Sequence, residues 1–150
     1  SPAMNRPLYE TKKDLNEELA IAKRLFAVWD VTQYYKLPLA YYTDFAICRK
    51  NKVVAVLEVK NRKHKPDTYP TLYFSLNKWL HGKRYKDEMN IEFLLGIGFS
   101  DGSIWHFKYD PSEKYEFDIT WGGRNKKRDS QDQEPVIHIP VSKLKKLDEA

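Results

Sequence analysis

The chain has a single cysteine and no long apolar run, and each absence narrows the classes of protein it can belong to. Cys48 alone can form neither an internal disulfide nor a cysteine-rich zinc site, which is typical of proteins from a reducing, intracellular setting. No stretch approaches the roughly 18 apolar residues of a membrane helix, and the N-terminus lacks the apolar segment of a secretory signal. We therefore expect no membrane partner. Residues 1–3, which precede Met4, are expected to be a remnant of cloning.

Hydrophobic and charged residues make up 41% and 31% of the 150 residues, which is typical of a globular protein. A chain of this length fits one core, so we expect residues 1–150 to form a single domain. The net charge of +5 favours a polyanionic partner, with nucleic acid first. Each basic run taken alone is also typical of a solvated face. These runs span residues 60–65, 83–86, 124–128 and 143–146.

The spacing of apolar residues indicates an alternation of helices and strands. Helical periodicity predicts helices over 11–29 and 70–89, and a short closing helix over 141–147. Strands are predicted over 35–39, 42–49, 53–60, 91–99, 104–109, 115–120 and 135–139, and a mobile loop over 122–134. The strands over 42–49 and 53–60 are apolar at nearly every position, so both faces of their sheet should be covered. The predicted class is α/β, with a mixed β-sheet flanked by helices.

Three charged residues interrupt this apolar hairpin, namely Asp44 on its first strand and Glu58 and Lys60 on its second. If residues 50–52 form a three-residue loop, Asp44 lies directly opposite Glu58, with Cβ atoms about 4.5–5.5 Å apart on one face. Glu58 and Lys60 are two residues apart on one strand, so they share that face. A two-residue loop would shift the pairing by one and place Asp44 on the opposite face. The predicted register therefore gathers two acids and an amine.

Two carboxylates at this spacing repel each other, so a partly buried pair is expected to share a proton or to bind a cation. Mg²⁺ or Mn²⁺ suits such an oxygen site, since one or two carboxylates are enough when water and phosphate complete the coordination. The metal polarises a phosphoryl oxygen, and a neighbouring lysine can orient water or stabilise charge in the transition state. These parts are those needed to hydrolyse a phosphodiester. The alternative is a simple cross-strand ion pair, since Glu-X-Lys is a common tripeptide in strands.

The first predicted helix carries a glutamate in the middle of its apolar stripe. Glu18 falls between Ile21, Ala22 and Leu25 on the helical projection, and Asp14 lies one turn earlier on nearly the same line. A carboxylate in a face that packs on the core needs a partner, because burial of an uncompensated charge is costly. A metal site or Lys60 could be that partner.

The pattern Thr43-Asp44, then Glu58-Val59-Lys60 fourteen residues on, resembles the PD-(D/E)XK nuclease superfamily. That superfamily includes restriction enzymes, Holliday-junction resolvases and phage nucleases. The segments 42–47 and 54–62 look like its core hairpin. The resemblance implies a restriction-endonuclease-like core of the order αβββαβ, here followed by extra C-terminal strands and a short helix. A chain of this kind looks most like phage-encoded members, which would place it in the cytoplasm of a prokaryotic or phage-infected cell.

The resemblance also implies roles for individual residues. Asp44 and Glu58 would bind the metal, Lys60 would be the catalytic lysine, and Glu18 would complete the site as the glutamate of the first helix. Polar residues of the second helix often face the site in this superfamily, and the candidates here are Ser75 and Lys78, with Asp14 as a further supporting residue. The superfamily's leading proline is replaced by Thr43, a position that varies.

Together these patterns predict a nuclease that depends on Mg²⁺ or Mn²⁺ and acts on DNA. Basic residues would bind backbone phosphates without reading sequence. One alternative is a non-catalytic nucleic-acid-binding or adaptor domain with this fold, and another is an RNA-directed nuclease. The oligomeric state stays open, and a homodimer is one option because symmetric cutting of two strands needs two sites. The predicted nucleic-acid contacts are Arg62, Lys63, His64, Lys65, Lys78, Lys83, Arg84 and Arg124.

Overall fold

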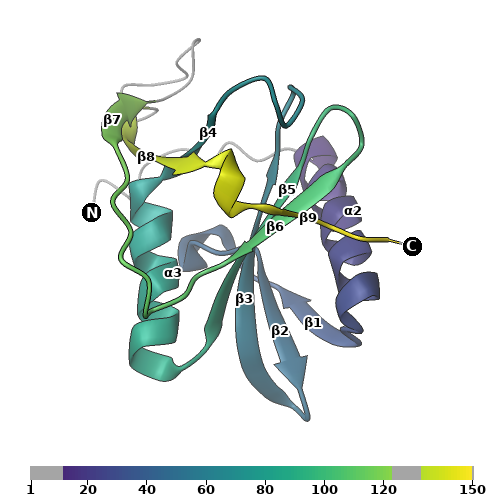
Figure 1. The fold of residues 1–150 in the computed structure, drawn as a ribbon. Helices are drawn as coiled ribbons and strands as arrows, with labels where there is room; N and C mark the ends of the chain where they lie inside the picture. The colour runs from purple at the N-terminus through teal and green to yellow at the C-terminus, as the bar shows by residue number, and fades with distance from the viewer. Residues whose placement is uncertain (1–11, 123–132, 150) are drawn as a thin grey trace.

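The main element of the computed structural model, which describes residues 12–122 and 133–149, is a mixed β-sheet with a helix on each side (Figure 1). Its six strands lie in the order β1-β2-β3-β5-β6-β9. Only β3 and β5 run parallel among neighbouring strands of this sheet. The predicted α/β class with a mixed, flanked sheet is confirmed. The strands are β1 (Gln33–Lys36), β2 (Phe45–Arg49), β3 (Lys52–Asn61), β5 (Glu92–Gly98), β6 (Ile104–Lys108) and β9 (Lys145–Lys146).

The two helices cover different faces because side chains alternate along the buried central strand β3. The first helix, α2 (Lys12–Trp29), packs Ile21, Ala22, Leu25 and Phe26 in one cluster with Leu57 and Val59. The second helix, α3 (Leu76–Met89), packs Trp79 in another cluster with Val56 and Phe93. The alternation that sends Leu57 and Val59 toward α2 sends Glu58 and Lys60 toward the α3 side.

A second, three-stranded sheet of order β4-β8-β7 lies on the α3 side. Its first strand occupies the beginning of the segment 70–89, so the helix predicted there is wrong over its first residues. Burial alternates along the segment, with Leu72 and Phe74 inside and Tyr73 exposed, which is a strand period and not a helical one. The helix begins only after Ser75, whose hydroxyl accepts the N–H of Lys78 at 3.3 Å. The strands are β4 (Thr71–Ser75), β7 (Ile119–Gly122) and β8 (Glu134–Pro140).

Other boundaries also differ from prediction. The closing helix predicted over 141–147 is wrong: a single 3₁₀ turn (Val141–Lys143) leads into β9, and Leu144 and Leu147 are buried. The strand predicted over 35–39 ends at Lys36, before Pro38, and the strand predicted over 42–49 begins only at Phe45. A 3₁₀ turn (Leu39–Tyr41) fills the interval. The strand predicted over 115–120 is replaced by β7, and most of the loop predicted over 122–134 lies outside the described residues.

Within residues 12–122 and 133–149, no helix has both the length and the apolar character needed to span a membrane.

Gly82 sets how closely α3 approaches the sheet. A Cβ at this position would lie 2.3 Å from the ring of Phe93, which is fully buried. Gly82→Ala would gain about 1 kcal/mol of helix propensity, but overpacking a core costs about 1–3 kcal/mol. We expect the free energy of unfolding to fall by up to about 2 kcal/mol in urea denaturation. Leu80→Ala, on the exposed side of the same helix, is the control, with a change within about 0.5 kcal/mol. A more stable Gly82→Ala protein would contradict this packing.

Candidate active site

The hairpin of β2 and β3 turns in two residues, so the predicted three-residue loop is wrong. Arg49 pairs with Lys52, and both Lys50 and Asn51 have positive φ, as a tight hairpin turn requires. A two-residue loop alone would send Asp44 to the wrong face. A β-bulge prevents this, because the register shifts by one residue between Ile47 and Cys48.

Beyond the bulge the register is the predicted one. Phe45 pairs with Leu57, so the next step along the hairpin brings Asp44 to the level of Glu58. The regular ladder ends here: the N–H of Asp44 donates to the carbonyl of Leu57 at 3.0 Å. The carboxylate of Asp44 then accepts the N–H of Val59 at 2.6 Å through Oδ2. The bulge thus compensates for the short turn and keeps the two acids together.

Asp44 is buried next to a second carboxylate. It is 6% exposed, and burial together with the charge of Glu58 raises the pKa of its carboxyl to about 6. The hydrogen bond from Val59 and the charges of Lys78 and Lys60 act in the opposite direction but do not cancel the shift. The raised pKa means that the ionised form of Asp44 is disfavoured in the protein without a bound cation.

Glu58 lies at the centre of the site and is 1% exposed. Its Oε1 is 2.8 Å from Nζ of Lys78, which comes from α3, and 3.2 Å from Nζ of Lys60 on its own strand. The carboxylate is therefore neutralised by two ammonium groups from different elements. Its other oxygen, Oε2, is buried and has no hydrogen-bond partner among the described residues.

The pKa values of the two lysines are shifted in opposite directions. Burial lowers the pKa of Lys60, and the charges of Lys78 and Arg62 lower it further, against the opposing effect of Glu58. Burial also acts to lower the pKa of Lys78, but its charge interaction and hydrogen bond with Glu58 outweigh burial and raise that pKa above its ordinary value. Lys60 therefore releases its proton more readily than an ordinary lysine, while Lys78 stays charged.

The donor set fits a hard divalent cation. Within residues 12–122 and 133–149, Glu58 Oε2 is a buried carboxylate oxygen without a hydrogen bond. Asp44 Oδ1 lies 3.8 Å from Nζ of Lys36, beyond hydrogen-bond distance. Two carboxylates are enough for Mg²⁺ when water and phosphate complete the coordination. In the part of the chain that the structure describes, no three His, Cys, Asp or Glu side chains are grouped to hold a metal ion. The candidate site thus offers two carboxylate ligands and not a complete set of protein ligands.

A model of the family described as phage putative PDDEXK endonuclease matches residues 4–147. The chain belongs to this family. A solved structure of Hjc, a Holliday junction resolvase from the archaeal hyperthermophile Archaeoglobus fulgidus, is similar in fold. It is 13% identical, covers 84% of this chain and 85% of that chain, and has a TM-score of 0.51. No curated protein sequence matches the chain. The predicted resemblance to the PD-(D/E)XK superfamily is confirmed, and the family indicates a nuclease of the PDDEXK type.

Among the described residues, the predicted glutamate of the first helix does not form a three-ligand group with the acidic pair. Glu18 lies on α2, which packs on the face of β3 that carries Leu57 and Val59. Glu58 and Lys60 alternate to the other face. Glu18 as a third ligand, with Asp14 as its support, stays a prediction. Ser75, predicted to face the site, acts in the structure as the residue that caps α3.

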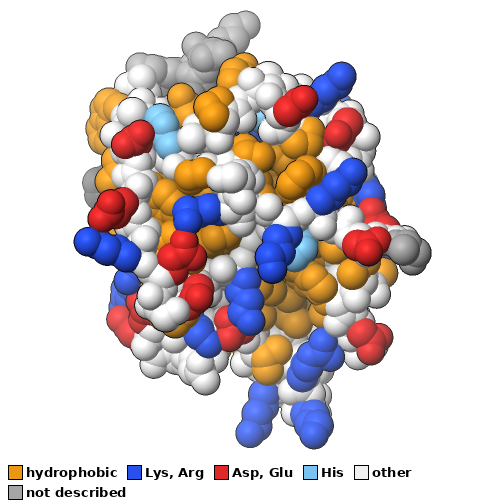
Figure 2. All heavy atoms as spheres, viewed as in Figure 1, with side chains coloured by type: hydrophobic (Ala, Val, Ile, Leu, Met, Phe, Trp, Pro, Cys, Tyr) orange, Lys and Arg blue, Asp and Glu red, His pale blue; other side chains and the backbone are white. Residues whose placement is uncertain are grey.

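The basic residues predicted to contact nucleic acid divide into two groups. Lys78 and Arg62 are engaged inside the protein, since Lys78 pairs with Glu58 and Arg62 donates to the carbonyl of Tyr73 at 2.7 Å. The others lie nearer the surface, and Arg124 is outside the described residues. On the face shown in Figure 2, basic and acidic side chains are intermingled and form no continuous basic patch. The group nearer the surface consists of Lys63, His64, Lys65, Lys83 and Arg84.

Two features near the site were missed by sequence reasoning: the contact of Lys36 with Asp44, and the burial of Thr43, which the motif marked only as the replacement of a proline. Lys36 Nζ lies 3.8 Å from Asp44 Oδ1, because Lys36 pairs with Phe45 across β1 and β2. Thr43 is 3% exposed, and its hydroxyl has no hydrogen-bond partner among the described residues. Both positions depend on strand pairing and irregular backbone, which no local spacing signals.

The raised pKa of Asp44 gives a test of the site in the absence of metal. Between the unfolded pKa of about 3.9 and the folded pKa of about 6, the native state binds more protons, so ionisation of Asp44 lowers stability as pH rises. Asp44→Asn keeps an acceptor for Val59 and removes the charge. In EDTA at pH 7.5, we expect it to raise the free energy of unfolding, by about 3 kcal/mol at most.

The gain should shrink to a small fraction near pH 4, where Asp44 is protonated in the native state and about half protonated in the unfolded state, and it should vanish at lower pH. Asp101→Asn is the matched control: Asp101 is exposed and its pKa is lowered by the hydrogen bonds of Ser103, so the substitution should bring no gain. Urea unfolding at both pH values measures the difference. An Asp44→Asn protein less stable than the parent at pH 7.5 would contradict the described electrostatics.

Proposed function

We propose that this protein is a nuclease that depends on Mg²⁺ or Mn²⁺ and hydrolyses phosphodiester bonds in DNA. The observation that carries the proposal is the buried pair of Asp44 and Glu58 with Lys60 at the same carboxylate. Family membership supports the nuclease class. The metal and the DNA substrate are inferred from the chemistry of the site and the charge of the chain.

Asp44 and Glu58 would hold the cation through their carboxylates. Glu58 Oε2 is buried without a hydrogen-bond partner among the described residues, and Asp44 Oδ1 lies 3.8 Å from Nζ of Lys36. A divalent cation bound there supplies positive charge that polarises a phosphoryl oxygen and acidifies water. Lys60 is positioned to donate a hydrogen bond to the attacking water or to the charged phosphoryl oxygens. Lys78 compensates the charge of Glu58 by holding a positive charge 2.8 Å from its Oε1.

The substrate is proposed to be DNA because the chain carries a net charge of +5 and has a run of basic residues directly after Lys60 in the sequence. Lys63, on the segment that follows Lys60, has a side chain 78% exposed, which suits contact with backbone phosphates. An RNA-directed enzyme would share the site and differ in substrate. A non-catalytic binding domain is disfavoured because the acidic pair and Lys60 are all present.

Cleavage assays test the proposal directly. Purified protein should degrade plasmid, linear, single-stranded or branched DNA with Mg²⁺ or Mn²⁺ and show no activity in EDTA. Lys60→Ala should lower the rate by about a hundredfold or more, the usual contribution of a residue that moves or orients a proton. Lys108→Ala, on the exposed end of β6, removes the same charge away from the site and should retain activity.

Circular dichroism would establish that both variants are folded. Degradation of RNA alone would reassign the substrate. Tight DNA binding without cleavage under any metal would favour the non-catalytic domain and contradict the enzymatic proposal.

A further inference from the structure

An aromatic residue close in sequence to the acidic pair, Tyr42, has a strained backbone conformation. Tyr42, two residues before Asp44, has φ 63° and ψ 4° and closes a 3₁₀ turn by donating its N–H to the carbonyl of Leu39. This left-handed conformation is uncommon for a bulky residue. Such residues cluster at functional sites, where the surrounding structure holds them in place.

The ring of Tyr42 stacks on the ring of His81 from α3, with centroids 4.0 Å apart and planes at 15°. His81 is held by its Nδ1, which lies 2.8 Å from the carbonyl of Asn77; since a carbonyl only accepts, Nδ1 is the donor. Tyr42 nevertheless remains 38% exposed. The stack therefore offers a fixed, partly open aromatic surface next to the candidate active site.

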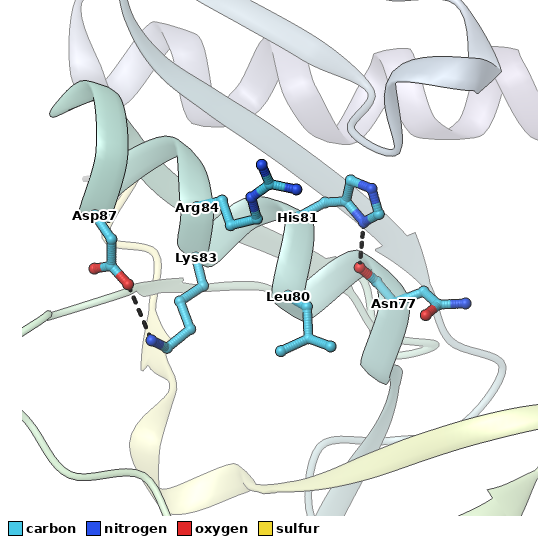
Figure 3. Close-up of a pocket in the computed structure, with 6 residues that line it drawn as sticks. All are labelled: Asn77, Leu80, His81, Lys83, Arg84 and Asp87. Carbon is cyan, nitrogen blue, oxygen red and sulfur yellow. Dashed lines mark hydrogen bonds and ion pairs between the residues drawn. The ribbon is translucent and has the colours of Figure 1, made fainter.

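Residues three apart on α3 extend this surface away from the site. Lys78, His81 and Arg84 follow one another at this spacing and so are neighbours along one ridge of the helix. Lys78 reaches Glu58, and His81 and Arg84 line a hollow of about 420 Å³. Figure 3 shows His81 and Arg84 pointing to the same side of α3, away from Leu80.

Arg84 is free to turn toward a ligand. Its Nε lies 3.2 Å from Glu88, but both side chains are more than half exposed, at 66% and 57%. An ion pair this open to water is weak, so a phosphate could replace the carboxylate. The ridge thus presents a partly buried ammonium, an aromatic stack and an exposed guanidinium in sequence. This order complements the alternation of phosphate and base along a nucleic-acid strand.

We propose that Tyr42, His81 and Arg84 form a stacking track that binds an unpaired segment of the substrate strand beside the cleaved phosphate. A nucleobase stacks on Tyr42, and a neighbouring phosphate binds Arg84. Bases within a duplex are stacked on one another and are not available to the track. The substrate class is therefore nucleic acid with a single-stranded segment, such as a single strand, an overhang or an unpaired branch. This inference rests on the proposed nuclease function.

The test uses Tyr42→Asn, because asparagine accepts the left-handed backbone and removes the ring, so the turn keeps its fold. Tyr42→Phe keeps the ring and serves as the conservative variant. Tyr41→Leu is the matched control, since Tyr41 is exposed and next in the chain but lies outside the track. Each protein is assayed with Mg²⁺ on a single strand, a blunt duplex and a duplex with an overhang. Separately, a single strand containing 2-aminopurine reports stacking by fluorescence quenching in EDTA.

Wild-type protein should prefer the substrates with unpaired segments and should quench 2-aminopurine. Tyr42→Asn should lose on the order of tenfold in the ratio of single-strand to duplex cleavage and in single-strand affinity, the usual effect of one lost stacking contact. Its quenching should disappear, while Tyr42→Phe and Tyr41→Leu behave like wild type. Equal losses on single strand and duplex, or unchanged quenching in Tyr42→Asn, would overturn the track and leave the nuclease intact. Quenching that depends on Tyr42 without cleavage of any substrate would retain the track and refute the nuclease.

Discussion

The structure of the site depends on one buried carboxylate. Glu58 is almost fully removed from water, and a lone charge in that position would be strongly destabilising. Lys60 from the same strand and Lys78 from α3 compensate it through the same oxygen, Oε1. The other oxygen has no hydrogen-bond partner in the described part of the chain, and the second acid, Asp44, is its neighbour. Glu58 therefore matters both for the stability of the fold and for the proposed binding of a cation.

Much of this arrangement could be predicted from the sequence, because it rests on short-range alternation. Glu58 and Lys60 share a face by the strand period, and polar residues in an otherwise apolar hairpin stand out. The level of Asp44 opposite Glu58 was predicted from a three-residue turn, and that turn is wrong. The turn has two residues, and a bulge restores the pairing. A bulge has no reliable signal in one sequence, since it reflects how the whole sheet packs. The same holds for Lys36, which reaches Asp44 only through pairing between β1 and β2.

The errors in secondary structure have a common cause. The segment 71–75 has apolar residues that suit a helix and a strand alike, and its pairing with β8, some sixty residues later, decides in favour of the strand. The end of the chain likewise became β9 by pairing with β6. Long-range pairing overrides local periodicity in both segments. The predicted role of Glu18 requires its carboxylate to lie close to those of Asp44 and Glu58. The helical periodicity of α2 alone could not establish that position.

We propose that Asp44 and Glu58 together hold a divalent cation, and anomalous diffraction from crystals grown with Mn²⁺ would locate that ion. We expect an anomalous peak within about 2.0–2.3 Å of a carboxylate oxygen from each of Asp44 and Glu58. Saturating Mn²⁺ that leaves no peak between these two residues, or that binds only elsewhere on the protein, would refute a metal site at this pair.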